Sequence, residues 1–323
     1  MRVEGRLAPE VNVPEEVGIA DIPNQMLKKV LQRGLTFNLL VVAEKGTGAK
    51  TLISSIYNLP HFPPLKEQVN DLYEYTTDIQ SNEILLTLNV LIYRGRSEKD
   101  LHTLVIDRNL QYNKSNVGIK RERVEDRRIH ASLFLISPLS FRSDDIAMLK
   151  ALSGLANTIT VITKRDMFTG TELDSYKARI NQELTAGLIH LYKSPRLSLA
   201  LPLATIASTS WVRVKDQTVR GREYRWGVLS AEDPESSDLA LLTSLLVTDS
   251  FVDLKKSTSH YYRKWKESTS ADPIRPKLGQ QEKDLLQEVE RTITQRLHER
   301  LQQLQQTEKL IDQAMHSLNA PLG

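Results

Sequence analysis

Cysteine is absent from the 323 residues of this chain. Without thiols, neither a disulfide framework nor a thiolate metal site can form, and the composition is compatible with a reducing compartment. Long apolar runs are absent too, since none approaches the ~18 residues that a membrane-spanning helix needs. The opening MRVEGRLAPEVNVPEEVGIA carries acids and prolines in place of the apolar core of a signal peptide. We therefore expect a cytoplasmic protein.

An excess of charge of one sign is also missing. The chain has 43 Lys and Arg against 40 Asp and Glu, a net charge of +3. This excess is too small for a nucleic-acid footprint over the whole surface, so we expect no nucleic-acid partner and only local patches for anions. With 40% hydrophobic and 26% charged residues, the composition is that of a soluble globular protein.

Strand-like apolar runs alternate with helical segments along the chain. Strands are expected at 37–42, 84–93, 101–106, 131–137 and 158–163, the second and third joined as a hairpin. A helix follows the first strand at 51–57, and another begins with Ser143 as its N-cap. A further helix opens at Thr169, where Glu172 completes a capping box. The alternation predicts an α/β fold with a mostly parallel sheet, which binds ligands at the carboxyl ends of its strands.

The segment VVAEKGTGAKTLI, residues 41–53, falls at the first strand-to-helix turn and has the form of a damaged phosphate-binding loop. A working loop reads G-x-x-x-x-G-K-S/T, in which the lysine reaches the phosphates and the hydroxyl binds magnesium. Here Ala43 replaces the first glycine, Ala49 the lysine and Lys50 the hydroxyl. The remnant would contact a nucleotide through Gly46, Gly48, Lys50 and Thr51.

Two further segments follow predicted strands in the order of a guanine-nucleotide-binding domain. Asp107 follows the strand predicted at 101–106 and would contact the magnesium shell. Lys164 and Asp166 lie in TKRD, where the carboxylate would accept hydrogen bonds from the guanine N1 and N2 hydrogens. Each match is weak alone, since a lone Asp after a strand is more often a turn residue. Their joint order supports a nucleotide site.

With these segments in place, the chain resembles a septin over roughly residues 17–266. GIADIPNQMLKKVLQRGLTFNLLVVAEKGTGAKTLISSIY, IHASLFLISP, NTITVITKRDMFTGTEL and LPLATIAS follow in the order of that family. The segment VRGREYRWGVLSAEDPESSDLALLTSLLVTDSFVDLKKSTSHYYRKW is similar to the septin unique element. Its G-R-x-Y-x-W-G core is Gly221, Arg222, Tyr224, Trp226 and Gly227. Generic GTPases lack this element.

The resemblance implies a P-loop GTPase-like domain and a subunit of heteromeric filaments formed with other septins. One of two alternating interfaces would include the nucleotide pocket, with Arg222 near the base and Tyr224 and Trp226 in the interface. A core position is the alternative for Trp226. The family role would be a cytoskeletal scaffold in cytokinesis, septum formation or membrane-associated morphogenesis, at the cell cortex, septum or division site.

Departures from the family pattern bear on catalysis. The predicted magnesium loop reads DRNL where the family has D-T-P-G, so Leu110 replaces a glycine whose N–H would meet the γ-phosphate. Phosphoryl transfer depends on positioned charge, and one preorganised donor is worth about 3 kcal/mol. We expect a pseudo-GTPase with no catalytic residue and no bound magnesium. Some GTP or GDP binding could remain, with Lys45 or Lys50 as a buried substitute charge. The alternative is a divergent active GTPase that uses Lys50 and Asp107.

The two ends of the chain suggest further contacts. The helix candidate MLKKVLQRG supplies Lys28, Lys29 and Arg33 for an anionic membrane surface, and a solvated face or a subunit contact is the alternative. An apolar stripe at 280–319 predicts a coiled coil with a partner, and a helix folded back on the domain is the alternative. The expected divisions are 1–35, a G domain at 36–266 with the unique element from about 210, a linker at 267–279, and the coiled coil.

Overall fold

The computed structural model describes residues 34–81, 84–116, 126–138, 140–194, 201–214 and 217–269. The chain divides into two compact units, residues 1–266 and 267–323, and nearly all described residues belong to the first. The predicted basic helix with Lys28, Lys29 and Arg33 lies outside the described residues, as does the predicted coiled coil at 280–319.

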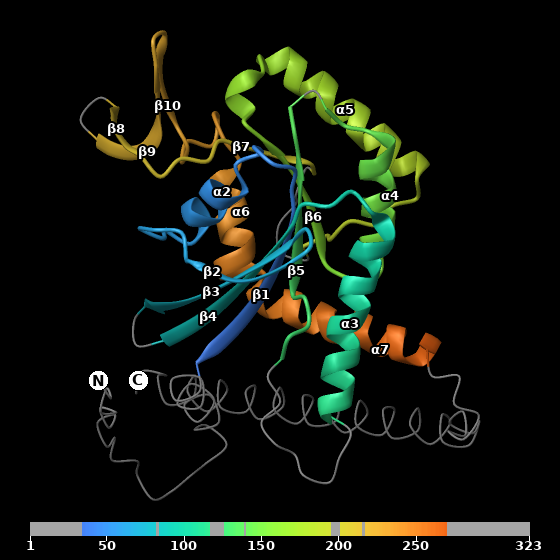
Figure 1. Ribbon diagram of the computed structural model, residues 1–323. Helices are drawn as coiled ribbons and strands as arrows, with labels where there is room; N and C mark the ends of the chain where they lie inside the picture. Colours follow the sequence, from blue (N-terminus) through green and yellow to red (C-terminus); the bar gives the residue numbers. More distant parts are fainter. Residues whose placement is uncertain are drawn as a thin grey trace, which may run out of the picture. The chain divides into compact units, whose positions relative to one another are not determined.

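A seven-stranded sheet with the order β2-β3-β4-β1-β5-β6-β7 forms the centre of the first unit (Figure 1). Its strands are β1 (Leu35–Val42), β2 (Leu65–Val69), β3 (Leu72–Ser81), β4 (Ile84–Tyr93), β5 (Ala131–Ile136), β6 (Thr158–Thr163) and β7 (Leu203–Thr205). The strands from β4 to β7 in that order pair in parallel, and β2 and β3 add an antiparallel edge. Every residue of β5 and β6 is buried, as expected for strands covered on both faces.

Helices cover the two faces of the sheet and enclose two hydrophobic clusters (Figure 1). One face carries α2 (Ala49–Ile56), α6 (Leu239–Thr243), the π-helix η3 (Ser244–Asp249) and the start of α7 (Phe251–Thr269). The other carries α3 (Glu98–Asn116), α4 (Ser143–Leu152) and α5 (Gly170–Ala186). This arrangement confirms the predicted α/β fold. None of the described helices is long and apolar enough to cross a membrane.

A second, three-stranded antiparallel sheet follows β7. It consists of β8 (Trp211–Val214), β9 (Gln217–Tyr224) and β10 (Gly227–Ser230) in the order β10-β9-β8. It lies within the range predicted for the septin unique element, which begins at about residue 210. A Cβ at Gly221 would come within 2.3 Å of the Leu229 carbonyl oxygen, so only glycine lets β9 approach β10 this closely.

Most predicted elements are confirmed, but the strand predicted at 101–106 is wrong. These residues belong to α3, whose first turn is acidic. The Asp100 N–H in this turn donates a hydrogen bond to the Ser97 hydroxyl oxygen, as at a helix N-cap. Leu101 and Val105 are buried four positions apart, which is helical spacing. The strand at Ile84–Tyr93 pairs instead with β3, which the sequence reading missed. Two smaller differences are that Arg142, not Ser143, is the N-cap of α4, and that α7 continues to Thr269, into the predicted linker.

A buried polar cluster joins α3, the segment before β5, and α7. The Arg128 guanidinium donates to both carboxylate oxygens of Asp126, at 2.9 and 2.7 Å, and lies 3.8 Å from the Tyr112 ring centre. Tyr262 of α7 lies on the same guanidinium, at 5.2 Å. His130 accepts from the Asn38 N–H at 2.9 Å and places Nε2 3.5 Å from Asp126. These contacts hold α7 against the sheet at the amino ends of β1 and β5.

Candidate functional site

The carboxyl ends of the parallel strands bring together loops that are far apart in the sequence. β1 and β4 pair in register up to Val42 and Tyr93, so the segments that follow them start side by side. β6 and β7 pair up to Thr163 and Thr205, and TKRD and 206–210 follow there. Such an edge is where open α/β sheets bind ligands. The structure therefore places the predicted phosphate and base segments at the same edge of the sheet.

The first loop has two glycines in left-handed conformations and is followed directly by the helix α2. Gly46 and Gly48 have left-handed φ angles of 90° and 86°, and a Cβ added to either would meet nothing within 4 Å. Gly48 is the N-cap of α2, which begins at Ala49, so Ala49 and Lys50 stand where a lysine and a hydroxyl are expected. The first N–H groups of a helix have no partner within it and suit an anion. Thr51 lies one residue further into α2.

The side chains of this loop are less suited to phosphate. The Glu44 carboxylate forms an ion pair with Arg96, which lies just after β4, at 2.6 Å. Burial raises the pKa of Asp145 at the start of α4, and Glu44 adds to that rise, whereas the backbone N–H of Arg142 opposes it. Because Arg96 is already paired with Glu44, it is less available to a phosphate. Glu44 and Asp145 also place acidic groups at this edge of the sheet.

Lys50 packs on two aromatic rings. Its ammonium lies 5.2 Å from the ring centre of Phe62 and 5.0 Å from that of Tyr75. The two rings meet edge to face, with centres 4.8 Å apart. The expectation of a buried lysine is wrong, because Lys45 and Lys50 are both exposed. Lys50 nevertheless has a defined place, on an aromatic pair.

A magnesium ion, which this kind of site implies, does not fit the residues present. β4 ends in the buried residues Ile92 and Tyr93, so no acid stands beside the first loop there. Asp107 lies within α3, and the premise that it follows a strand is wrong. No group of three His, Asp or Glu side chains arranged for a metal occurs among the described residues. Gly95, three residues after Ile92, keeps the glycine of a D-x-x-G loop, a signal that the sequence reading missed.

The segment predicted to bind the base keeps its lysine and its aspartate, Lys164 and Asp166. Lys164 has a left-handed φ of 54° and is the N-cap of a short 3-10 helix, Arg165–Met167. The Asp166 carboxylate is only 9% exposed, and its Oδ2 accepts a hydrogen bond from the Tyr224 hydroxyl. Its Oδ1 is buried and has no partner in the described protein. An unpaired buried acceptor is costly, so this oxygen is free for a ligand donor.

Arg222 and Tyr224 of β9 frame Asp166. Arg222 donates to the Ala207 carbonyl oxygen through Nη2 at 3.0 Å and Nε at 3.2 Å, and its Nη1 lies 3.5 Å from Asp166 Oδ2. Burial raises the pKa of Tyr224, and the hydrogen bond to Asp166 raises it further. The alternative of a core position for Trp226 is wrong, because this residue is 68% exposed. Its ring stacks on Tyr224 with centres 5.0 Å apart.

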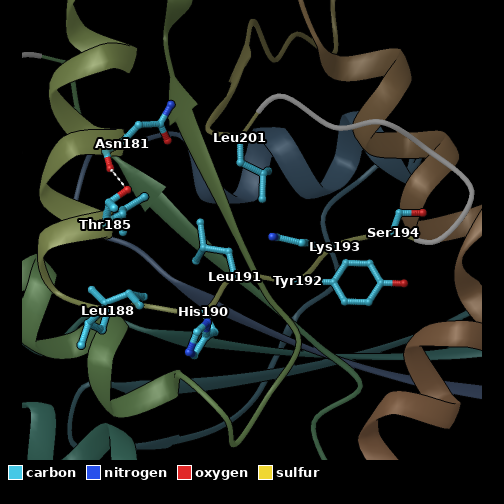
Figure 2. A pocket seen from close by; sticks show the side chains of 11 residues that line it. Asn181, Thr185, Leu188, His190, Leu191, Tyr192, Lys193, Ser194 and Leu201 are labelled. Carbon is cyan, nitrogen blue, oxygen red and sulfur yellow. Dashed lines mark hydrogen bonds between the residues drawn. The ribbon is translucent and has the colours of Figure 1, made fainter.

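A separate hollow of about 650 Å³ lies at the other end of the sheet (Figure 2). Figure 2 shows Asn181 and Thr185 of α5 on one side and Tyr192 and Lys193 on the other. The Tyr192 N–H donates to the carbonyl oxygen of Thr158, the first residue of β6. The hollow is thus near the amino end of that strand and contains none of the predicted site residues.

Comparison with known proteins identifies the family. The septin family model matches residues 33–273. Septin-5 of Rattus norvegicus is 29% identical over 280 residues, covering 76% of each chain. Septin-4 of Homo sapiens is 28% identical over 282 residues, covering 76% of this chain and 59% of that protein.

A solved structure is similar in fold. The crystal structure of the septin GTPase domain from Chlamydomonas reinhardtii matches with a TM-score of 0.57 and 19% identity, covering 72% of this chain and 98% of that chain. The match of the family model to most of the chain agrees with this fold. The chain belongs to the septin family, and this membership supports a cytoskeletal role.

Proposed function

We propose that this septin is a filament subunit that assembles with other septins, still recognises the guanine base, and does not hydrolyse GTP. Its role is that of a cytoplasmic scaffold at the cell cortex, septum or division site, in cytokinesis or membrane-associated morphogenesis. The observation that carries the proposal is an asymmetry within one site. Asp166 at the base end offers a buried unpaired oxygen, whereas the phosphate end lacks the groups that catalysis requires.

Recognition of guanine rests on Asp166. The guanine edge presents two neighbouring N–H donors, and a carboxylate that accepts both is the complementary partner. The hydrogen bond from Tyr224 fixes the carboxylate and leaves Oδ1 for a ligand. A base lacking the matching donors would leave a buried acceptor unpaired, which gives the site its selectivity.

Loss of hydrolysis follows from three substitutions. Ala49 removes the phosphate lysine, Lys50 removes the magnesium hydroxyl, and Ile92 stands where an acid would face the metal. A single preorganised group of this kind is typically worth about 3 kcal/mol of barrier, so losing three abolishes useful turnover.

Assembly uses the exposed surface beside the base. Trp226 is an exposed aromatic residue held rigid by its stack on Tyr224, and such residues are typical interface anchors. The basic segment with Lys28, Lys29 and Arg33 would add contacts to an anionic membrane, and residues 280–319 would add a coiled-coil partner.

The test is to purify the full chain, denature it, identify any released nucleotide by chromatography, and follow phosphate release from added GTP. We expect guanine nucleotide binding that Asp166→Ala abolishes, without phosphate release. Asp107→Ala is the matched control, since this carboxylate lies in α3, and it should change nothing. Phosphate release that Asp107→Ala abolishes would favour the active GTPase instead. Failure of the wild-type chain to bind any guanine compound would refute base recognition.

Light scattering and pull-down with other septins test the scaffold role. A chain that stays monomeric with every septin offered would contradict assembly into filaments, whatever its nucleotide content.

A further inference from the structure

Lys50 occupies the position at which a phosphate-binding loop has the hydroxyl that binds magnesium. It is the second residue of α2 and directly follows the loop turn at Gly48 and Ala49. Its side chain therefore starts beside the unpaired N–H groups of the first turn, where the phosphates of a nucleotide would lie. A positive charge at this point can only be favourable to an anion and unfavourable to a metal ion.

Two segments outside α2 define the place of the Lys50 ammonium. Phe62 comes from the segment between α2 and β2, and Tyr75 is a buried residue of β3, paired with Val90 of β4. Both ring centres lie about 5 Å from the ammonium nitrogen, within the range of cation–π attraction. Since Tyr75 belongs to the sheet, this contact holds the lysine near one position.

The ammonium keeps its hydrogen-bond donors available. Among the residues that the structure describes, Lys50 has no carboxylate partner, whereas Glu44 is paired with Arg96. Aromatic faces attract a cation without accepting strong hydrogen bonds, so the three ammonium N–H groups remain free for phosphate oxygens. Lysine binds phosphate in this way, as a point charge.

A divalent cation would find the opposite conditions. It would meet the Lys50 ammonium in place of a hydroxyl ligand, and the buried Ile92 side chain in place of an acid. Like charges at short distance repel each other, at an exposed position as well. The residues present therefore disfavour the metal that this fold ordinarily uses.

We infer that Lys50, seated on Phe62 and Tyr75, is a built-in cation that replaces the divalent metal, so that the site takes the diphosphate of a guanine nucleotide without Mg²⁺. This inference rests on the proposed recognition of guanine. It adds that the phosphate end contributes affinity through Lys50 and that the metal does not.

The experiment is calorimetric titration of the full, nucleotide-free chain with GDP and with guanosine, each in Mg²⁺ and in excess EDTA. The wild-type chain should bind GDP equally in both buffers, within about twofold, and more tightly than guanosine. Lys50→Met keeps the length and removes the charge, and it should weaken GDP binding at least about tenfold without changing guanosine binding. Lys50→Arg should restore most of the loss. Lys66→Met, an exposed lysine of β2, is the matched control for net charge.

Each contrary result is distinct. GDP binding at least about tenfold weaker in EDTA would show that a metal is used and would overturn the inference, as would Lys50→Met with unchanged GDP affinity. Equal affinities for GDP and guanosine would also overturn it, while base recognition would stand. If neither compound binds, both the inference and the proposed base recognition fail. A melting temperature of Lys50→Met close to that of the wild-type chain excludes misfolding as the cause.

Discussion

The Tyr224 hydroxyl donates a hydrogen bond to Oδ2 of Asp166, the carboxylate predicted to read guanine. The same tyrosine stacks on Trp226, with an angle of 6° between the rings. One side chain thus contacts both the buried Asp166 carboxylate and the exposed Trp226, which lies in the turn between β9 and β10. A ligand that shifts Asp166 can therefore act on the surface that another subunit would contact.

Tyr224→Phe tests the buried half of this link. The substitution keeps the ring and its stack but removes the hydroxyl, so Asp166 loses a donor. Hydrogen bonds to charged groups contribute about 1.5–3 kcal/mol, and we expect the free energy of unfolding to fall by a similar amount. Urea denaturation measures it. Tyr73→Phe is the control, since no hydrogen bond of its hydroxyl is present among the described residues. Equal effects of the two substitutions would contradict the role of the hydroxyl.

Trp226→Ala tests the exposed half. Because the side chain is 68% exposed, the free energy of unfolding should change by less than about 1 kcal/mol. Association with a partner septin should weaken by about 2 kcal/mol or more if Trp226 anchors the interface. Surface-immobilised binding measures this loss. Leu188→Ala, at an exposed residue beside the hollow of Figure 2, should leave association unchanged. A normal affinity of Trp226→Ala would exclude the anchor.

The sequence was sufficient for the elements with clear local signals. The apolar runs of β1, β4, β5 and β6 and the capping box at Thr169 and Glu172 depend on residues close together in the chain, and the structure has them as predicted. Lys164 and Asp166 were placed at the correct strand end because β6 is unbroken and ends directly before them.

The error at Asp107 has a physical cause. The run LHTLVI is apolar enough for a short strand, and a buried helix face can have the same composition over six residues. The acidic turn at 98–100 and the Ser97 cap are signals for a helix, but the polar run RGRSEKD that contains them also suits a hairpin loop. The contact between Lys50 and Phe62 could not be predicted, since it depends on how the segment after α2 folds back.

The contact between Lys50 and Phe62 can be measured without any nucleotide. In a double-mutant cycle with Lys50→Met and Phe62→Leu, the coupling energy should be about 0.5–1 kcal/mol, the usual value for a cation–π pair at an exposed site. Thermal or urea unfolding of the four proteins provides it. A parallel cycle of Lys66→Met with Phe62→Leu should give a coupling near zero, and equal couplings in the two cycles would argue against a specific contact.

The cluster of Asp126, Arg128 and His130 should make the free energy of unfolding decrease as the pH is lowered. Burial alone would raise the pKa of Asp126, but hydrogen bonds from Arg128 and His130 outweigh it and hold this pKa well below its ordinary value of 3.8. Burial lowers the pKa of His130 below its ordinary 6.5, against the opposing effect of Asp126. In both cases the unfolded chain binds the proton more readily, so protonation favours unfolding.

The expected profile has two steps. Stability should be full above about pH 7, decline as His130 of the unfolded chain takes up its proton, and decline again below about pH 4 as Asp126 does. Asp126→Asn should lower stability at pH 7 by about 1–3 kcal/mol, since Arg128 then keeps a buried charge without its partner. It should also flatten the lower step in urea denaturation across pH. Asp174→Asn, at an exposed position of α5, should leave the profile unchanged. A lower step that survives in Asp126→Asn would mean that other carboxylates govern acid unfolding and that this cluster does not.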